Sequence, residues 1–224
     1  MNGMFDDRKD AGQRLGRALA KYQGKNVLVL AIPRGGVEVG YELARTLDAD
    51  FSLVIVRKLP FPDNPEAGFG AIAEDGSTII IERAIYGVPQ DTLERIIEFQ
   101  QEEIKRRVQV LRKGESLPDL KGRTVILVDD GIAMGSTMRA AIKLCKNQEA
   151  GRVVVAVPVT GESVAREIEA LVDEIVVLEK PRFFRAVAQV YRNWYDVSDQ
   201  EVFEIMKTWR SEMREAGKVS EGER

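Results

Sequence analysis

Short apolar runs rich in Val, Ile and Leu alternate along the chain with segments whose apolar residues recur every three to four positions. The runs are continuously apolar, which is typical of parallel strands buried on both faces of a sheet. They predict strands over residues 27–32, 51–56, 124–128, 152–159 and 174–178. The segments between them predict helices over residues 8–22, 37–47, 89–112, 136–147, 162–170 and 199–214. The pattern therefore predicts an α/β fold with a central, mainly parallel five-stranded sheet flanked by helices.

Two segments depart from this alternation. Residues 69–73 and 78–82 flank the turn sequence Glu-Asp-Gly-Ser, which predicts a β-hairpin inserted before the long helix. Arg57 and Lys58 stand at the end of the second predicted strand, and the residues after them, 59–71, are rich in Pro, Asn and Gly and predict a loop. We expect a single domain over residues 1–216 with hood elements at about 58–84 and 179–198, followed by a disordered tail at 217–224.

The amino-acid composition excludes several kinds of catalytic site, metal site and cross-link. The chain has 224 residues, no His, one Cys and a formal net charge of -3. This excludes Ser-His and Cys-His nucleophile pairs, imidazole zinc sites and any intramolecular disulfide. The nearly balanced charge argues against a broad nucleic-acid surface. Without a run of about 20 apolar residues or a secretory leader, we expect no membrane contact and a cytoplasmic location.

The most informative motif follows the third predicted strand. Asp129 and Asp130 end the strand, and the small-residue turn 131–137 leads into a helix that starts at Ser136. A helix start offers unpaired N–H groups and the positive end of its dipole to an anion. Two carboxylates suit vicinal hydroxyls and Mg²⁺ rather than phosphate. A phosphate cradle beside two acids indicates a sugar phosphate, and the alternative is a strand-to-helix turn in which Asp and Gly are incidental.

This segment resembles the phosphoribosyl pyrophosphate (PRPP) loop of the type I phosphoribosyltransferases. The resemblance implies that Asp129 and Asp130 hold the ribose hydroxyls, take part in catalysis and hold Mg²⁺ as the cofactor. It also implies a type I phosphoribosyltransferase-like fold. The residues that it assigns to the 5′-phosphate are Gly131, Ile132, Ala133, Met134, Gly135, Ser136 and Thr137.

The motif departs from the family at two positions. Met134 stands where a Thr usually precedes the second Gly, so one hydroxyl donor to the phosphate is lost. A hydrogen bond to a charged group is worth roughly 1.5–3 kcal/mol, which would weaken PRPP binding. Ala133 stands where hypoxanthine/guanine-type members have an Asp, and a standard 6-oxopurine reaction is therefore in doubt.

Two further segments complete the expected site. Residues 32–37, Ile-Pro-Arg-Gly-Gly-Val, resemble the pyrophosphate loop of the same family, and a tight turn with a surface Arg is the alternative. Cations at the end of the second predicted strand suit a pyrophosphate leaving group. The expected pyrophosphate residues are Arg34, Gly35, Gly36, Arg57 and Lys58, of which Lys58 is also expected to be catalytic. Glu66, in the loop that follows, is a candidate acid/base, and a surface position without a catalytic role is the alternative for it.

The residues that would bind the acceptor are the part of the site that the sequence defines least. Phe183 and Phe184 are candidates for stacking on a base, and ordinary packing on the sheet explains them as well. Over residues 5–210 the chain resembles an uncharacterised phosphoribosyltransferase group of bacteria and archaea. The resemblance implies Mg²⁺-dependent transfer of the phosphoribosyl group from PRPP to a nucleobase-like acceptor, in a homodimer. A non-catalytic regulator that binds PRPP, nucleotides or RNA is the alternative, and water as the acceptor is a third option.

Overall fold

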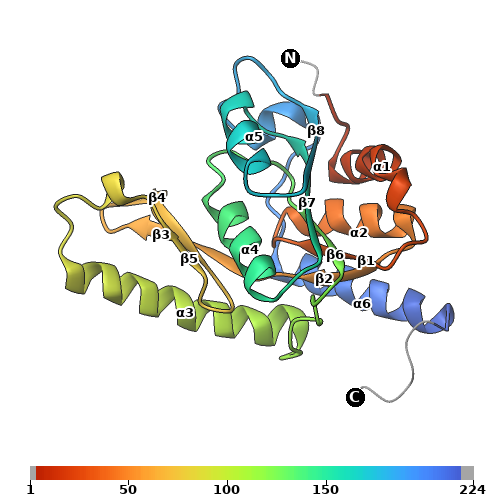
Figure 1. The fold of residues 1–224 in the computed structure, drawn as a ribbon, viewed down its shortest axis with the longest axis horizontal. Coiled ribbons are helices and arrows are strands. Elements are labelled where there is room, and N and C mark those ends of the chain that lie inside the picture. The colour runs from red at the N-terminus through yellow and green to blue at the C-terminus, as the bar shows by residue number, and fades with distance from the viewer. Residues whose placement is uncertain (1–3, 218–224) are drawn as a thin grey trace.

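The computed structural model describes residues 4–217, and the side chains of residues 65 and 66 are outside the described part (Figure 1). Five parallel strands form the main sheet in the order β2-β1-β6-β7-β8. The strands are β1 (Val27–Ala31), β2 (Asp50–Leu53), β6 (Thr124–Val128), β7 (Arg152–Val159) and β8 (Glu174–Glu179). The predicted α/β fold with a five-stranded parallel sheet is confirmed.

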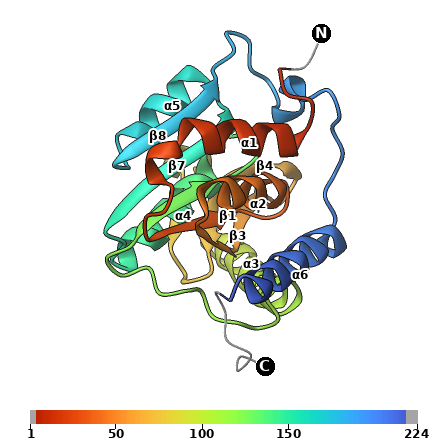
Figure 2. The same cartoon turned by 90° about the vertical axis from the view of Figure 1, so that its right-hand side faces the viewer.

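Helices cover both faces of this sheet, because its apolar side chains point alternately to either side. Helices α1 and α2 lie together on one face, which faces the viewer in Figure 2, and α4 and α5 lie on the other. The long α3 and the last helix, α6, pack against each other beside the sheet. Their bounds are α1 (Arg8–Ala18), α2 (Gly36–Leu47), α3 (Gln90–Arg112), α4 (Ser136–Asn147), α5 (Glu162–Glu169) and α6 (Asp199–Glu215). Short 3₁₀ turns occupy Ala20–Tyr22, Glu82–Ala84 and Val187–Val190.

The predicted helices are all present, with differences at their ends. The first is shorter than expected, because α1 ends at Ala18 and the chain continues as a 3₁₀ turn. The last begins with a capping box, in which Ser198 Oγ accepts from the Glu201 N–H at 3.2 Å and Glu201 accepts from the Ser198 N–H at 2.7 Å. Within residues 4–217, no helix is both long enough and apolar enough to cross a membrane.

A second sheet corrects two predictions. The expected strand over 51–56 is present but shorter: β2 ends at Leu53, and the chain then leaves the main sheet to form β3 (Val56–Phe61). The expected loop over 59–71 is wrong, since β3 pairs antiparallel with β4 (Asn64–Ala73), which pairs with β5 (Thr78–Ile80). The β4–β5 turn confirms the predicted hairpin.

Proline and glycine misled the prediction here for structural reasons. Pro60 is tolerated because β3 is an edge strand, where a missing N–H costs no ladder bond. Gly70 is required because a Cβ there would lie 2.1 Å from the Ile79 carbonyl oxygen of the neighbouring strand. Pro60 thus stands at the edge of this sheet, where it is tolerated, and Gly70 stands where two strands approach each other closely and a side chain would clash.

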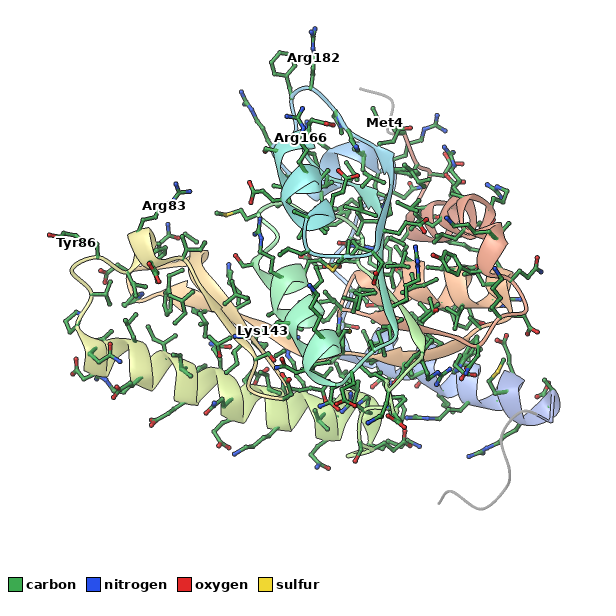
Figure 3. All side chains as sticks on the ribbon, viewed as in Figure 1. Met4, Arg83, Tyr86, Lys143, Arg166 and Arg182 are labelled. Carbon is green, nitrogen blue, oxygen red and sulfur yellow. The ribbon has the colours of Figure 1, made fainter. Side chains whose placement is uncertain are left out.

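The second sheet and α3 project from the main sheet as an arm (Figure 1). Tyr86, at the far end of the arm, is 95% exposed, and both Arg83 and Tyr86 point outward there (Figure 3). At the near end, Lys143 of α4 donates to the Thr78 carbonyl of β5 at 3.1 Å, which ties the arm to the main body (Figure 3). The arm contains the expected hood element at 58–84.

A buried ion pair joins the arm to the main sheet. Arg112, at the end of α3, donates to both carboxylate oxygens of Glu74 in the β4–β5 turn and to the Leu53 carbonyl at the end of β2. Glu74 also accepts from the Ile55 N–H at 2.8 Å. The side chains of Arg112 and Glu74 are only 3% and 11% exposed, so this pair is shielded from solvent and fixes where the chain changes sheets.

We expect Glu74→Gln to lower the free energy of unfolding by about 3–5 kcal/mol, because it leaves the Arg112 charge buried without its partner. Urea unfolding followed by circular dichroism measures the change. Glu102→Gln is the matched control, since its pair with Lys105 has both side chains 71% exposed and is worth less than about 1 kcal/mol. Equal losses in the two variants would contradict a structural role for the buried pair.

Candidate active site

A cleft of about 290 Å³ opens at the carboxyl ends of the parallel strands. It lies where β1 and β6 are neighbours while the chain connections lead away from them in opposite directions, to β2 on one side and to β7 on the other. Such a switch point is where open α/β sheets bind ligands. The cleft is lined by Lys58, Gly68, Gly70, Asp129, the turn 131–137 and Val187.

The turn after β6 has the geometry of an anion cradle. Gly135 has a φ of 80°, the left-handed region, and α4 starts at the next residue. The first N–H groups of α4 therefore face the cleft together with the hydroxyls of Ser136 and Thr137. Gly131 is needed because a Cβ there would lie 2.7 Å from Val187 Cγ1, so the 179–198 segment packs directly onto the turn.

The two adjacent acids face different surroundings. Asp129 lines the cleft, and one of its oxygens, Oδ1, accepts from the Asp130 N–H at 2.8 Å. The Asp130 carboxylate instead accepts from Nε of Arg8 in α1 at 2.8 Å. The expected pair of equivalent ribose-holding acids is therefore split, with one in the cleft and one in an ion pair.

The loop after β1 lies against these acids, and its glycines make this contact possible. A Cβ on Gly35 would lie 1.8 Å from Asp130 Oδ2, and a Cβ on Gly36 would lie 2.9 Å from the Asp129 Cα. The peptide bond between Pro33 and Arg34 is cis. Both segments that the sequence assigns to PRPP thus meet at adjacent strand ends.

Arg8 is the main residue of this site that the sequence did not reveal. Its side chain is only 4% exposed, and its guanidinium lies 4.1 Å from the Trp194 ring centre. It also donates to the Tyr195 carbonyl at 3.0 Å and pairs with Glu38 of α2 at 3.4 Å. The available signal was the aromatic run after residue 190, since a buried Arg is often held between aromatic faces.

The cations expected at the pyrophosphate diverge. Lys58 lines the cleft, whereas Arg57 donates to Gln100 of α3 at 2.9 Å. Neighbouring residues of a strand point to opposite faces, so only one of the two can face the cleft. Arg34 is 43% exposed and pairs with Asp199, at the start of α6, at 3.7 Å.

The remaining expected residues are placed as follows. Phe183 is 83% exposed, whereas Phe184 is partly buried and packs with Phe5, Val159 and Tyr191. Packing thus explains Phe184, and Val187 is the residue of that segment that lines the cleft. Glu66 lies in β4, and its side chain is outside the described part of the structure.

Comparison with known proteins gives the family. A family model described as a phosphoribosyl transferase domain matches residues 6–193. The chain belongs to this phosphoribosyl transferase family. The matched span includes the residues that line the cleft and both partners of the Arg8–Asp130 ion pair.

Two relatives of this phosphoribosyl transferase domain illustrate its extent. A protein named "Putative phosphoribosyl transferase Rv0571c" from Mycobacterium tuberculosis is 39% identical over 218 residues, which is 96% of this chain and 49% of the relative. The chain thus spans about half the length of the curated relatives it matches. The crystal structure of TT1426 from Thermus thermophilus is 37% identical, with a TM-score of 0.77 over 93% of this chain and 99% of that one.

Burial shifts the pKa of both acids at the end of β6. It raises the pKa of Asp129 well above its usual range, and the neighbouring Asp130 charge raises it further. Burial also raises the pKa of Asp130, and the Arg8 cation opposes this rise. A cation or a hydroxyl group bound to Asp129 would therefore stabilise its ionised form, as Arg8 does for Asp130.

The family resemblance implies Mg²⁺, and the position of Asp129 suits this ion whereas that of Asp130 does not. Mg²⁺ takes oxygen ligands and is commonly held by one or two carboxylates together with substrate phosphates. Asp129 presents a carboxylate to the cleft, whereas Arg8 binds the Asp130 carboxylate. Among the described residues no three acids or other metal ligands gather. Asp129 would therefore hold Mg²⁺ together with phosphate oxygens of the substrate.

We expect Arg8→Gln to destabilise the fold by about 3–5 kcal/mol at neutral pH, because it leaves the Asp130 carboxylate buried without its cation. In the variant, the pKa of Asp130 should rise further above its unfolded value of about 3.9. The folded state then holds more protons than the unfolded state, so the stability deficit grows as pH rises through this window.

Urea unfolding of Arg8→Gln and wild type at pH 5 and pH 8 measures this effect, and the deficit should be larger at pH 8. Arg192→Gln is the control, since its pair with Asp6 has side chains 54% and 60% exposed. A deficit that is the same at both pH values would show that Asp130 does not depend on Arg8 for its charge.

Proposed function

We propose that this phosphoribosyl transferase domain catalyses Mg²⁺-dependent transfer of the 5-phosphoribosyl group from PRPP to a nucleobase-like nitrogen, with release of pyrophosphate. The proposal rests on the residues that line one cleft. An acid, Asp129, and a cation, Lys58, line the same space as a glycine and hydroxyl turn at a helix N-terminus. These are the groups required by ribose hydroxyls, pyrophosphate and the 5′-phosphate, respectively.

Each part of the cleft has a role in this reaction. The 5′-phosphate accepts from the N–H groups of the turn and from the Ser136 and Thr137 hydroxyls, and Asp129 accepts from a ribose hydroxyl. Bound Mg²⁺ would neutralise charge on the pyrophosphate. As the bond from ribose C1 to the pyrophosphate oxygen breaks, its electron pair leaves with the pyrophosphate, whose charge Lys58 stabilises. The acceptor nitrogen forms the new bond to C1, and a proton that it loses passes to the pyrophosphate, a carboxylate or solvent.

The decisive experiment is pyrophosphate release from Mg-PRPP across a panel of purines, pyrimidines and their precursors. We expect release with at least one acceptor. Asp129→Asn should lower the rate about a hundredfold or more, because it removes a charge from the reacting site. Asp91→Asn is the matched control, since Asp91 is an exposed acid on α3 and should leave the rate unchanged.

The alternatives give different results in the same assay. Tight binding of PRPP without release for any acceptor would favour a regulator over an enzyme. Release that needs no acceptor would indicate hydrolysis. An Asp129→Asn variant as active as wild type would contradict the assignment of the ribose site.

Met134 gives an independent test. It lies on the cradle turn with 65% of its surface exposed, so a change there does not disturb the core. Met134→Thr should tighten PRPP binding about tenfold, because it adds a hydroxyl donor near the expected 5′-phosphate. Calorimetric titration with Mg-PRPP measures this change, with Met134→Leu as the control. Equal affinities for the two variants would show that this position does not contact the phosphate.

A further inference from the structure

A second and larger cavity, of about 410 Å³, lies at the opposite edge of the main sheet. We call it the basal pocket and define it by Phe51, Arg112, Arg123, Met206, Trp209 and Arg210. It opens at the amino ends of β1, β2 and β6, under α6, whereas the cleft lies at their carboxyl ends. Six residue steps separate Arg123 from Asp129 along β6, or about 20 Å, so the two sites are distinct.

The basal pocket gathers buried N–H donors that have no partner. Within the described part of the chain, four buried side-chain polar atoms lack a hydrogen bond, and three of them are on its arginines. They are Arg112 Nε, Arg123 Nε and Arg210 Nη1. An unpaired buried donor costs about 1–3 kcal/mol, so three of them in one pocket indicate a group that accepts from them.

Each of these arginines also forms an ion pair through another of its donors, which restricts the position of the side chain. Arg123 pairs with Asp50, and Arg210 pairs with Glu115 at 2.9 Å. Arg112 is bound to Glu74, as described above, and its side chain is 3% exposed. The unpaired donors are therefore held in position before any ligand arrives, which lowers the entropic cost of binding.

The charge of the pocket favours an anion. Four arginines line it, Arg214 being the fourth, against the two acids Asp50 and Glu115. Even when Glu74, which pairs with Arg112 from outside the lining, is counted, one positive charge is left over. Guanidinium groups suit phosphate and carboxylate oxygens because their donors form a planar fork.

The remaining wall of the pocket is apolar and partly aromatic. The Trp209 ring packs edge-on against Phe51 with ring centres 5.4 Å apart, and Met206 and Met213 lie beside it. Apolar walls with a few convergent polar groups are typical of small-molecule sites, and 410 Å³ lies within their usual range of roughly 300–1,000 Å³.

We propose that the basal pocket is a second ligand site, which binds a small organic anion that carries a phosphate or carboxylate group on a planar apolar body. The oxyanion accepts from the unpaired donors of Arg112, Arg123 and Arg210, and the planar body lies against the Trp209 wall. The site is independent of the reaction proposed for the cleft.

Trp209 supplies a direct readout. The chain has two Trp residues, and the second, Trp194, lies over Arg8. In a Trp194→Phe background, tryptophan fluorescence reports on the basal pocket alone. We expect phenyl phosphate or benzoate to change the Trp209 fluorescence saturably, and the stronger of the two probes identifies the preferred oxyanion.

Arg123→Gln and Arg210→Gln should each weaken binding at least about tenfold, the loss expected for a hydrogen bond to a charged group. Both variants should fold, because the acids they leave, Asp50 and Glu115, are 65% and 59% exposed. Arg95→Gln, an exposed position on α3, is the matched control and should bind as wild type does.

Each of the following outcomes would overturn the proposal. They are equal binding by neutral benzyl alcohol, equal binding by inorganic phosphate, unchanged affinity in both arginine variants, and no saturable change with either probe. Asp129→Asn separates the two sites, because it should leave this binding intact, and loss of binding in that variant would assign the probe to the cleft.

Discussion

The ion pair between Arg8 and Asp130 is the contact on which the arrangement of the cleft depends. It holds the first helix against the end of β6, and it lies so close to the loop after β1 that only glycine fits at position 35. Trp194 and Tyr195 enclose the guanidinium from the C-terminal side. Burying both charges is favourable only when each is paired and hydrogen-bonded, so these four segments have to assemble together. The anion cradle and Asp129 are positioned as a result.

Much of the fold could be predicted from the sequence because its signals are local. Five β-branched apolar runs become five parallel strands, since such runs can only be buried from both sides. Helix ends likewise follow short-range chemistry, as the capping box at Ser198 shows. The turn at 129–137 was found for the same reason, because a strand end, its acids and a helix start occupy consecutive residues.

What the sequence could not reveal depends on contacts between distant segments. Pro60 and Gly70 have the composition of a loop, and only the neighbouring strand explains why a sheet accepts them. Arg57 and Lys58 look equivalent in sequence, yet the direction of β3 gives one to α3 and the other to the cleft. Arg8 looked like an ordinary helix residue, because its partner Asp130 is 122 positions away.

The absence of histidine can be related to the charged residues that line the cleft. Among the described residues that line the cleft, Asp129 is the acid and Lys58 is the cation, and burial holds the pKa of Asp129 above its usual range. A carboxylate in this setting binds a hydroxyl or a cation more readily than it stays ionised alone. The proposed phosphoribosyl transfer would therefore depend on placing charge around a leaving group and on oriented N–H groups rather than on an imidazole base.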